Sequence, residues 1–295
     1  MGYPIDSVEK SGRSPVLRSS LSFRLKIFFK QLLTVLILAW KLPFFFVTLS
    51  VFLLVSLPGA LLIRQLRTQQ RFHMLMTHFF CRFFLWLNGF RVHVPHRPDP
   101  QSHDLIVGNH LGLLDILVHS ATRPALFITS TDMRDTPGLG LLTRMGASLY
   151  VNRRNRQNIR AEVLEIRETL LSGLNVVLFP EATSTNGEQV LPFKKTLLTA
   201  AAGTGIHIRP VVINYRRVNG EPVGLKYRDH VCWYGDQSFL SALLRILSMR
   251  CCDVELLYFE PLRMETPEQR SHVAETAYRL IQTNFTPLGR DVSAC

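Results

Sequence analysis

Apolar positions are concentrated near the N-terminus, where the chain carries no charge at all from Leu42 to Ile63. A helix that crosses a bilayer needs about 20 such residues. Residues 23–40 are also apolar apart from a few basic and amide side chains. The stretch is too long and too far from the N-terminus for a removable signal peptide, and no A-x-A cleavage pattern follows it. We therefore expect residues 1–22 to be a disordered basic tail and residues 23–66 to form a membrane helix or helical hairpin.

Basic residues flank this stretch on both sides, which bears on its topology. They are Arg13, Arg18, Arg24, Lys26 and Lys30 before it, and Arg64, Arg67 and Arg71 after it. The positive-inside rule disfavours export of either cluster. We expect a hairpin that turns near Lys41-Leu42-Pro43, or a helix pair that dips into one leaflet, rather than a single crossing. The domain that follows this stretch would then lie on the cytoplasmic face, in a bacterial inner membrane. The alternative is a core helix of a soluble protein, in which so long an uncharged run is rare.

The next stretch, Arg71 to Leu87, has apolar side chains at helical spacing opposite basic ones. The apolar side chains are Phe72, Leu75, Met76, Phe79, Phe80, Phe83 and Phe84. Such a face suits either the core of the domain or a membrane interface. We expect most of it to lie in the core.

Beyond Asn88-Gly89, short apolar runs alternate with helical patterns. The runs predicted as strands are Arg91–Val94, Asp104–Val107, Ala125–Thr129, Ser148–Val151, Val176–Phe179, His207–Ile213 and Val254–Phe259. A helical stripe lies between Asn158 and Leu171. A capping box at Thr266–Gln269, with proline at its first helical position, opens a helix that ends at about Asn284. The alternation is typical of an α/β domain, here residues 67–295.

Composition narrows the class of partner. A formal charge of +12 and a pI of about 9.9 favour an anionic partner, and a hydrophobic content of 47% favours a phospholipid surface. A nucleic acid is not expected, because no nucleic-acid-binding motif accompanies the basic cluster Arg153–Arg160. The five cysteines show neither paired spacing nor a zinc pattern, so no disulfide framework and no metal site are expected.

His110 and Asp115 are the first candidates for chemistry, in the sequence Asn109-His-Leu-Gly-Leu-Leu-Asp115. Side chains five positions apart on a continuous helix diverge by about 140°, so this pair could not meet there. If Asn109–Leu113 is a turn between a strand and a helix, the aspartate can reach back to the histidine. A histidine so held can deprotonate a hydroxyl group. A structural, hydrogen-bonded histidine is the alternative interpretation.

Three further segments follow in order, and with the first they identify a family. They are Gly146 to Arg153, Phe179-Pro-Glu181-Ala-Thr183-Ser-Thr185, and Ile208-Arg-Pro210-Val-Val212. This ordered set resembles the four sequence blocks of the PlsC-type glycerolipid acyltransferase family. The resemblance covers roughly residues 70 to 260. It implies a central, mostly parallel sheet flanked by helices.

The resemblance also implies an activity like that of 1-acylglycerol-3-phosphate acyltransferases. A fatty acyl group would pass from acyl carrier protein or acyl-CoA to the hydroxyl of a lysolipid, with no cofactor. His110 would be the general base and Asp115 would hold its tautomer. Residues implied in substrate binding are Gly146, Thr183, Glu181 and Pro210, with Arg153 and Lys194 for an anionic head. A covalent acyl-enzyme is not expected, because the chain has no G-x-S-x-G elbow and no motif that activates a cysteine.

Two residues depart from the family pattern. Ala182 replaces the usual glycine, and Ser184 replaces an arginine associated with a substrate phosphate. The stretch from Ser184 to Lys194 is similar instead to the lyso-ornithine lipid acyltransferase branch, whose substrate has no such phosphate. An alternative of another class is a non-catalytic basic membrane scaffold with a decayed site. The joint presence of His110, Asp115 and Glu181 argues against decay.

Overall fold

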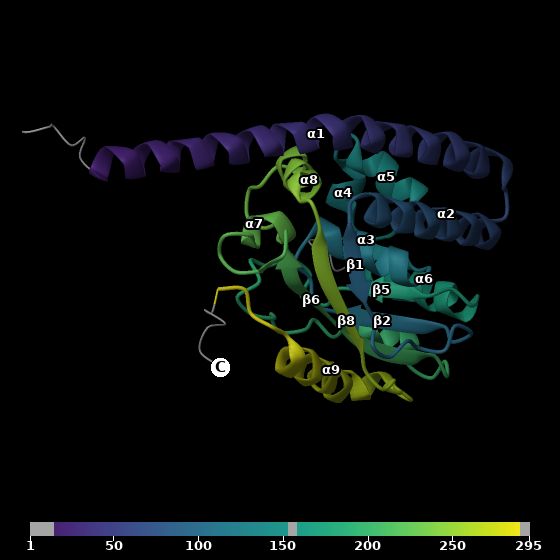
Figure 1. Ribbon diagram of the computed structural model, residues 1–295. Coiled ribbons are helices and arrows are strands. Elements are labelled where there is room, and N and C mark those ends of the chain that lie inside the picture. Colours follow the sequence, from purple (N-terminus) through teal and green to yellow (C-terminus); the bar gives the residue numbers. More distant parts are fainter. Residues whose placement is uncertain (1–14, 153–157, 290–295) are drawn as a thin grey trace, which may run out of the picture.

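The computed structural model describes residues 15–152 and 158–289, and Figure 1 shows a layered α/β domain beneath one long helix. That helix is α1 (Pro15–Leu62), and α2 (Leu66–Leu87) follows it after a short turn. The disordered tail expected over residues 1–22 is therefore wrong from Pro15 onward, and residues 1–14 lie outside the described residues. The remaining helices are α3 (Leu113–Thr122), α4 (Thr131–Asp135), α5 (Leu139–Met145), α6 (Ile159–Leu171), η2 (Leu197–Ala201), α7 (Arg228–Val231), α8 (Phe239–Ser248), η3 (Pro267–Gln269) and α9 (Arg270–Asn284).

The sheet has the strand order β1-β8-β6-β2-β5-β3-β4, with β7 paired to β6. Its strands are β1 (Phe90–His93), β2 (Asp104–Gly108), β3 (Leu126–Ser130), β4 (Leu149–Val151), β5 (Val176–Leu178), β6 (His207–Val218), β7 (Glu221–Pro222) and β8 (Cys252–Tyr258). Strand β2 runs parallel to β5 and β6, and β3 runs parallel to β4 and β5. Strand β8 is antiparallel to β6. All seven strands expected from the sequence are present, and the mostly parallel α/β class is confirmed.

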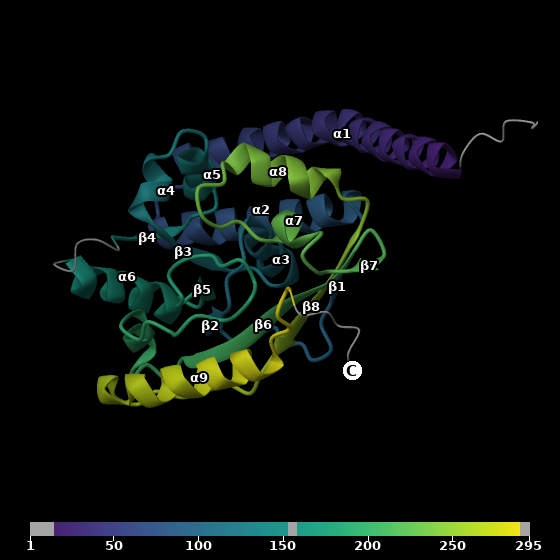
Figure 2. The same ribbon diagram turned by 90° about the vertical axis from the view of Figure 1, so that its left-hand side faces the viewer.

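Helices cover both faces of the sheet, which explains why its central strands are uninterrupted apolar runs. In β2, Ile106 packs in the core formed with α2, α3 and α8, whereas Leu105 and Val107 pack on the other face against α6, η2 and α9. Figure 2 shows these two helical layers on either side of the sheet. The expected helices at residues 158–171 and 266–284 are confirmed, and the capping glutamine Gln269 accepts from the backbone N–H of Glu265 at 2.8 Å.

The hairpin turn expected near Lys41-Leu42-Pro43 is wrong, because α1 stays helical through Pro43 and ends at Leu62. The charge of Lys41 is accommodated within the apolar helix because it has partners on the domain. Its Nζ donates to the carbonyl of Asn88 at 3.3 Å and to that of Met249 at 2.5 Å. These carbonyls cap the C-terminal ends of α2 and α8, where a cation is favoured. The chain reverses instead between α1 and α2.

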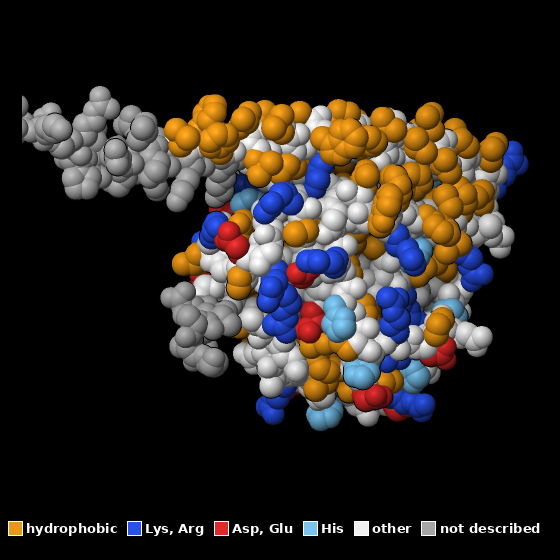
Figure 3. Space-filling view, in the orientation of Figure 1, with side chains coloured by type: hydrophobic (Ala, Val, Ile, Leu, Met, Phe, Trp, Pro, Cys, Tyr) orange, Lys and Arg blue, Asp and Glu red, His pale blue; other side chains and the backbone are white. Residues whose placement is uncertain are grey.

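The outward surface of α1 and α2 is apolar. Among the described residues, one helical segment, Gln31–Leu62, is long and apolar enough to cross a membrane, with a mean hydropathy of 2.3. The aromatic face of α2 was expected mostly in the core, and this is wrong for Leu75, Phe79 and Phe83, which are exposed. They continue the apolar surface of α1, so one hydrophobic band covers both helices (Figure 3).

Candidate active site

The loop between β2 and α3 brings the two candidate catalytic side chains together, as the sequence predicted. Strand β2 ends at Gly108 and α3 begins at Leu113, which places Asp115 in the first helical turn. From there its Oδ2 lies 2.9 Å from Nδ1 of His110. The predicted turn and the predicted contact between the two side chains are confirmed.

Asp115 is fully buried, and both of its carboxylate oxygens accept hydrogen bonds. Oδ2 accepts from the backbone N–H groups of Leu111 at 2.6 Å and Gly112 at 2.8 Å, besides His110. Oδ1 accepts from the hydroxyl of Tyr215 at 2.6 Å. A carboxylate can only accept, so the proton of the neutral imidazole sits on Nδ1 and leaves the Nε2 lone pair free.

Phe179 and Glu181 hold the histidine from its other side. The imidazole of His110 stacks on the ring of Phe179, with centroids 4.2 Å apart and planes 7° apart. Oε1 of Glu181 accepts from the backbone N–H of His110 at 2.7 Å, and Oε2 accepts from that of Leu191 at 2.7 Å. Burial raises the pKa of the Glu181 carboxyl to about 7, although both backbone hydrogen bonds favour its ionised form. Glu181 therefore fixes the backbone beneath the histidine.

The structure explains why asparagine stands at position 109 and glycine at position 112, on either side of His110. The side chain of Asn109 donates to the carbonyl of Ile213 at 3.1 Å and accepts from its N–H at 2.9 Å, which continues the β2–β6 pairing past the end of β2. At Gly112, a Cβ atom would lie 2.7 Å from the backbone nitrogen of Trp233. Only glycine allows the Trp233 segment to approach this closely.

His110 opens onto an apolar cavity of about 270 Å³. The cavity lies between the domain and the N-terminal helices: Phe45 and Phe52 of α1 and Phe80 of α2 line it together with His110 and Gly146. No Lys, Arg, Asp or Glu is among the described residues of its wall. Such a cavity suits an alkyl chain whose reacting end reaches the imidazole.

The structure places the residues expected to bind substrate in different surroundings. Glu181 is buried, and both of its carboxylate oxygens accept from backbone N–H groups. Gly146 lines the cavity at the end of α5. Thr183 and Lys194 are exposed, and Pro210 is buried in β6 within the sheet. Arg153 lies outside the described residues. The structure therefore brings Gly146 to the cavity and Glu181 to the backbone of His110, and the substrate-binding roles of all six residues stay predictions.

The two departures from the family pattern have distinct structural consequences. Ala182 has a φ of 60°, in the left-handed region that favours glycine. Ser184 Oγ donates to the backbone carbonyl of Trp233, so this side chain ties the Phe179–Glu181 segment to the loop before α8. Sequence reasoning missed Tyr215 and Trp233, because neither stands in a motif near His110.

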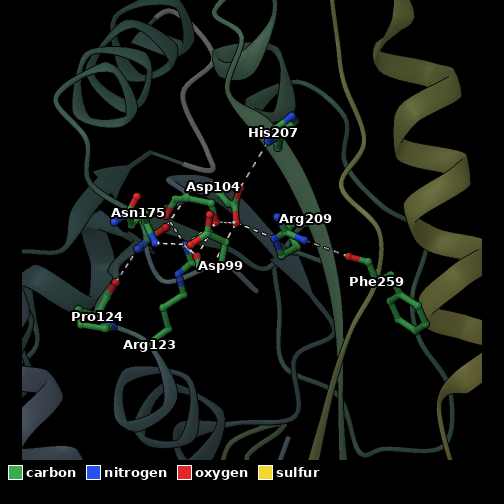
Figure 4. Close-up of polar contacts among 10 residues, drawn as sticks. Asp99, Asp104, Arg123, Pro124, Asn175, His207, Arg209 and Phe259 are labelled. Atoms are coloured by element: carbon green, nitrogen blue, oxygen red, sulfur yellow. Dashed lines mark hydrogen bonds and ion pairs between the residues drawn. The ribbon is translucent and has the colours of Figure 1, made fainter. Parts of the chain in front are cut away.

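Arg209, in the fourth block, lies far from this site. Its Nε donates to Oδ2 of Asp104 at 2.6 Å, and Arg123 contacts the same oxygen at 3.3 Å. Figure 4 shows this network around Asp104, the first residue of β2. Since His110 follows the last residue of β2, the network lies at the opposite edge of the sheet.

A metal site needs a cluster of ligand side chains, and a cysteine nucleophile needs a thiol that ionises. Within residues 15–152 and 158–289, no cluster of three or more His, Cys, Asp or Glu side chains could hold a metal ion. Cys81 lines the apolar cavity, but burial raises the pKa of its thiol to about 12. A thiol that stays protonated at neutral pH is a poor nucleophile.

Comparisons with known proteins agree with this geometry. The model of the family described as Acyltransferase matches residues 89–214. A lyso-ornithine lipid O-acyltransferase of Brucella abortus (strain 2308) is 31% identical over 83% of this chain and 98% of its own length. A 1-acyl-sn-glycerol-3-phosphate acyltransferase of Neisseria gonorrhoeae is 32% identical over 52% of this chain and 59% of its own. The crystal structure of PlsC from Thermotoga maritima superposes with a TM-score of 0.53 at 21% identity, covering 85% of this chain and 93% of the other.

Proposed function

This chain belongs to the PlsC-type acyltransferase family and is an acyltransferase of membrane lipid biosynthesis, and we propose that it acylates the free hydroxyl of a lyso-ornithine lipid. One observation carries the chemistry: the buried carboxylate of Asp115 holds Nδ1–H of His110, and the histidine faces an apolar cavity. The acyl donor in this proposal is a thioester, in which the acyl group is carried by acyl carrier protein or by CoA.

In the proposed reaction, Nε2 of His110 removes the proton of the acceptor hydroxyl. The oxygen then attacks the thioester carbonyl, the C–S bond breaks, and the imidazolium returns its proton to the leaving thiolate. Asp115 stabilises the imidazolium while Tyr215 and the backbone of Leu111 and Gly112 hold the carboxylate in place. The stack on Phe179 keeps the ring plane constant through both proton transfers.

The choice of acceptor rests on the charge around the cavity. A phosphate monoester is best held by several cations. The described wall of the cavity has none, and Ser184 donates to a backbone carbonyl at the position where the family pattern has arginine. The Brucella abortus relative and one of Rhizobium meliloti (strain 1021), 32% identical over 67% of its length, are both lyso-ornithine lipid O-acyltransferases. An acceptor without a phosphate monoester fits these observations.

Lysophosphatidic acid is the second candidate acceptor. The similarity to the Neisseria gonorrhoeae enzyme favours it, and Arg153 and Lys194 would then have to hold the phosphate. The exposed position of Lys194 leaves room for such a contact at the surface.

The proposed attachment to the membrane is interfacial, with α1 and α2 lying in one leaflet and the domain on the cytoplasmic face. α1 packs along α2, α5 and α8 rather than standing away from the domain. Its outward side exposes large apolar residues, among them Phe28, Trp40 and Leu54. A helix of this kind buries its apolar face at the boundary between headgroups and acyl chains.

The test is an acceptor panel. The full chain, purified in detergent, would be mixed with acyl-(acyl carrier protein) or acyl-CoA that carries a labelled acyl group. Each acceptor, lyso-ornithine lipid, lysophosphatidic acid or another lysolipid, would be added separately. The proposal expects the highest kcat/KM for lyso-ornithine lipid, and no transfer by the His110→Ala variant. A clear preference for lysophosphatidic acid would establish the second candidate instead.

A further inference from the structure

A second and larger cavity, of about 540 Å³, lies at the edge of the sheet opposite His110. One face of α2 forms one wall. The loop between β1 and β2, the end of α3 and the segment before β5 form the others, through Arg97, Arg123 and Asn175. The cavity shares no lining residue with the apolar one beside the catalytic histidine.

This cavity is strongly cationic. Its charge comes from four arginines, Arg71, Arg82, Arg97 and Arg123. His78 and His103 also line it, and burial lowers the pKa of His78. No Asp or Glu is among its described lining residues. Arg123 shares the carboxylate of Asp104 with Arg209. No ion pair with a described carboxylate occupies Arg71, Arg82 or Arg97, and Arg71 donates only a long hydrogen bond, 3.5 Å, to the carbonyl of Ser172. Unpaired guanidinium groups around one hollow are suited to bind an oxyanion.

Tyr258 provides a second, independent observation. It lines the cavity, and its hydroxyl oxygen is buried with no hydrogen-bond partner among the described residues. A buried polar group without a partner is costly, so such groups normally meet a ligand or water. The hydroxyl is a donor, which matches the oxygen atoms of an anion.

The cavity also adjoins the hydrophobic band. Leu75 of α2 both lines the cavity and belongs to the exposed apolar surface that continues through Phe79 and Phe83. Figure 3 shows Lys, Arg and His side chains directly below the band over α1 and α2. When the band is buried in acyl chains, this zone lies at headgroup depth.

We propose that this cationic cavity binds the phosphate group of an anionic phospholipid, as a site separate from the one where acyl transfer takes place. The bound headgroup fixes the domain on the membrane, with the apolar cavity opening beneath α1 toward the acyl chains. The shared chemistry is a phosphate anion, so a soluble phosphate compound is the other source that the test must separate. The inference rests on the interfacial attachment and not on the identity of the acceptor.

The test measures binding of the full-length protein to vesicles, with no acyl donor present. Vesicles of phosphatidylcholine alone are compared with vesicles containing about 30% phosphatidylglycerol. A triple variant, Arg71→Gln, Arg82→Gln and Arg97→Gln, removes the unpaired cations. Each arginine near an anionic surface contributes about fivefold in affinity, so we expect the triple variant to lose most of the preference for phosphatidylglycerol.

Two further variants separate a cavity from general surface charge. The matched control changes Arg263, Arg270 and Arg279, three exposed arginines at the α9 side, to glutamine and alters the net charge equally. It should keep the preference. Thr122→Trp fills the cavity without changing any charge, and it should lose the preference. The inactive His110→Ala protein should bind like the wild type, which keeps this test independent of catalysis.

Titrations with inorganic phosphate and with glycerol 3-phosphate distinguish the two sources. Vesicle preference with weak binding of the free compounds supports the lipid headgroup. Binding of the free compounds alone, lost in the triple variant and in Thr122→Trp, would overturn the lipid assignment in favour of a soluble phosphate ligand. The inference is also overturned if the α9-side control loses as much preference as the cavity variant, or if Thr122→Trp keeps it.

Discussion

The hydroxyl of Tyr215 donates a 2.6 Å hydrogen bond to Oδ1 of Asp115, a residue 100 positions earlier in the chain, while the other carboxylate oxygen holds His110. Tyr215 lies on β6 and is buried, and its pKa is raised well above the ordinary value, chiefly by burial and then by the charge of Asp115. It is therefore a permanent donor that positions the aspartate rather than a group that touches substrate.

Tyr215→Phe should lower kcat by about tenfold with little change in KM, because a hydrogen bond to a charged group contributes about 1.5–3 kcal/mol and acts here on the catalytic pair. Steady-state kinetics with the preferred acceptor would check this. Tyr227→Phe is the matched control, because Tyr227 is also buried but makes no hydrogen bond to Asp115 among the described residues. An unchanged kcat for Tyr215→Phe would show that the other donors suffice to hold Asp115.

His110→Ala should lower acyl transfer by about 10²–10⁴-fold while the protein stays folded and membrane-bound, since this is the usual contribution of a general base. Asp115→Asn should lose nearly as much, because an amide can present its NH₂ group to Nδ1 and favour the wrong tautomer. The exposed His272 offers a control, as His272→Ala should be fully active. Wild-type rates in His110→Ala would refute the assignment of the base.

The stability of the protein should depend on pH through the titration of Glu181. Burial raises its folded pKa from the ordinary 4.5 to about 7, so between these values the folded state binds more protons than the unfolded state. The contribution of Glu181 to the free energy of unfolding is largest below about pH 4.5. It falls as the pH rises to about 7, by at most about 3 kcal/mol. The Tm difference between wild type and Glu181→Gln, measured from pH 4.5 to 8, should fall across this window and then level off. A constant difference would contradict the raised pKa.

Ala182→Gly should raise the free energy of unfolding by up to about 1 kcal/mol, because the φ of 60° penalises alanine more than glycine. Chemical denaturation of the purified protein would measure the gain. Ala161→Gly on the exposed face of α6 is the control, and there the same change should destabilise by about 0.5–1 kcal/mol. Destabilisation at both positions would mean that the turn gains nothing from glycine.

Ser184→Arg should shift the ratio of kcat/KM values toward lysophosphatidic acid by about 1–2 kcal/mol, the scale of one charge-assisted hydrogen bond. Thr183→Arg places the same charge on the exposed neighbouring residue and should shift the ratio less. In parallel, Arg153→Ala should raise the KM for lysophosphatidic acid if that residue holds the phosphate. Strong wild-type preference for lysophosphatidic acid, unaffected by Arg153→Ala, would contradict the charge argument for either acceptor.

The sequence by itself determined the features that depend on neighbouring residues. Local pattern predicted a strand over Asp104–Val107 and allowed a turn over Asn109–Leu113, across which Asp115 could reach His110. The family resemblance then implied that the two side chains act together, and the structure shows the contact. The same local logic gave every strand longer than two residues and the capped helix at the C-terminus. The order of the motifs did not predict which side chains line the cavity, because order along the chain does not say where a side chain points.

Tertiary structure alone decided the relationships between distant segments. Tyr215 and Phe179 meet His110 and Asp115 only because β6 and β5 flank β2, and Arg209 was carried to the opposite edge by the direction of the same strands. The charge of Lys41 within the apolar α1 is met by carbonyl groups of Asn88 and Met249, which no local pattern reveals. Periodicity records which face of a segment is apolar. Whether that face meets a core or a membrane is determined by what the rest of the chain packs against it.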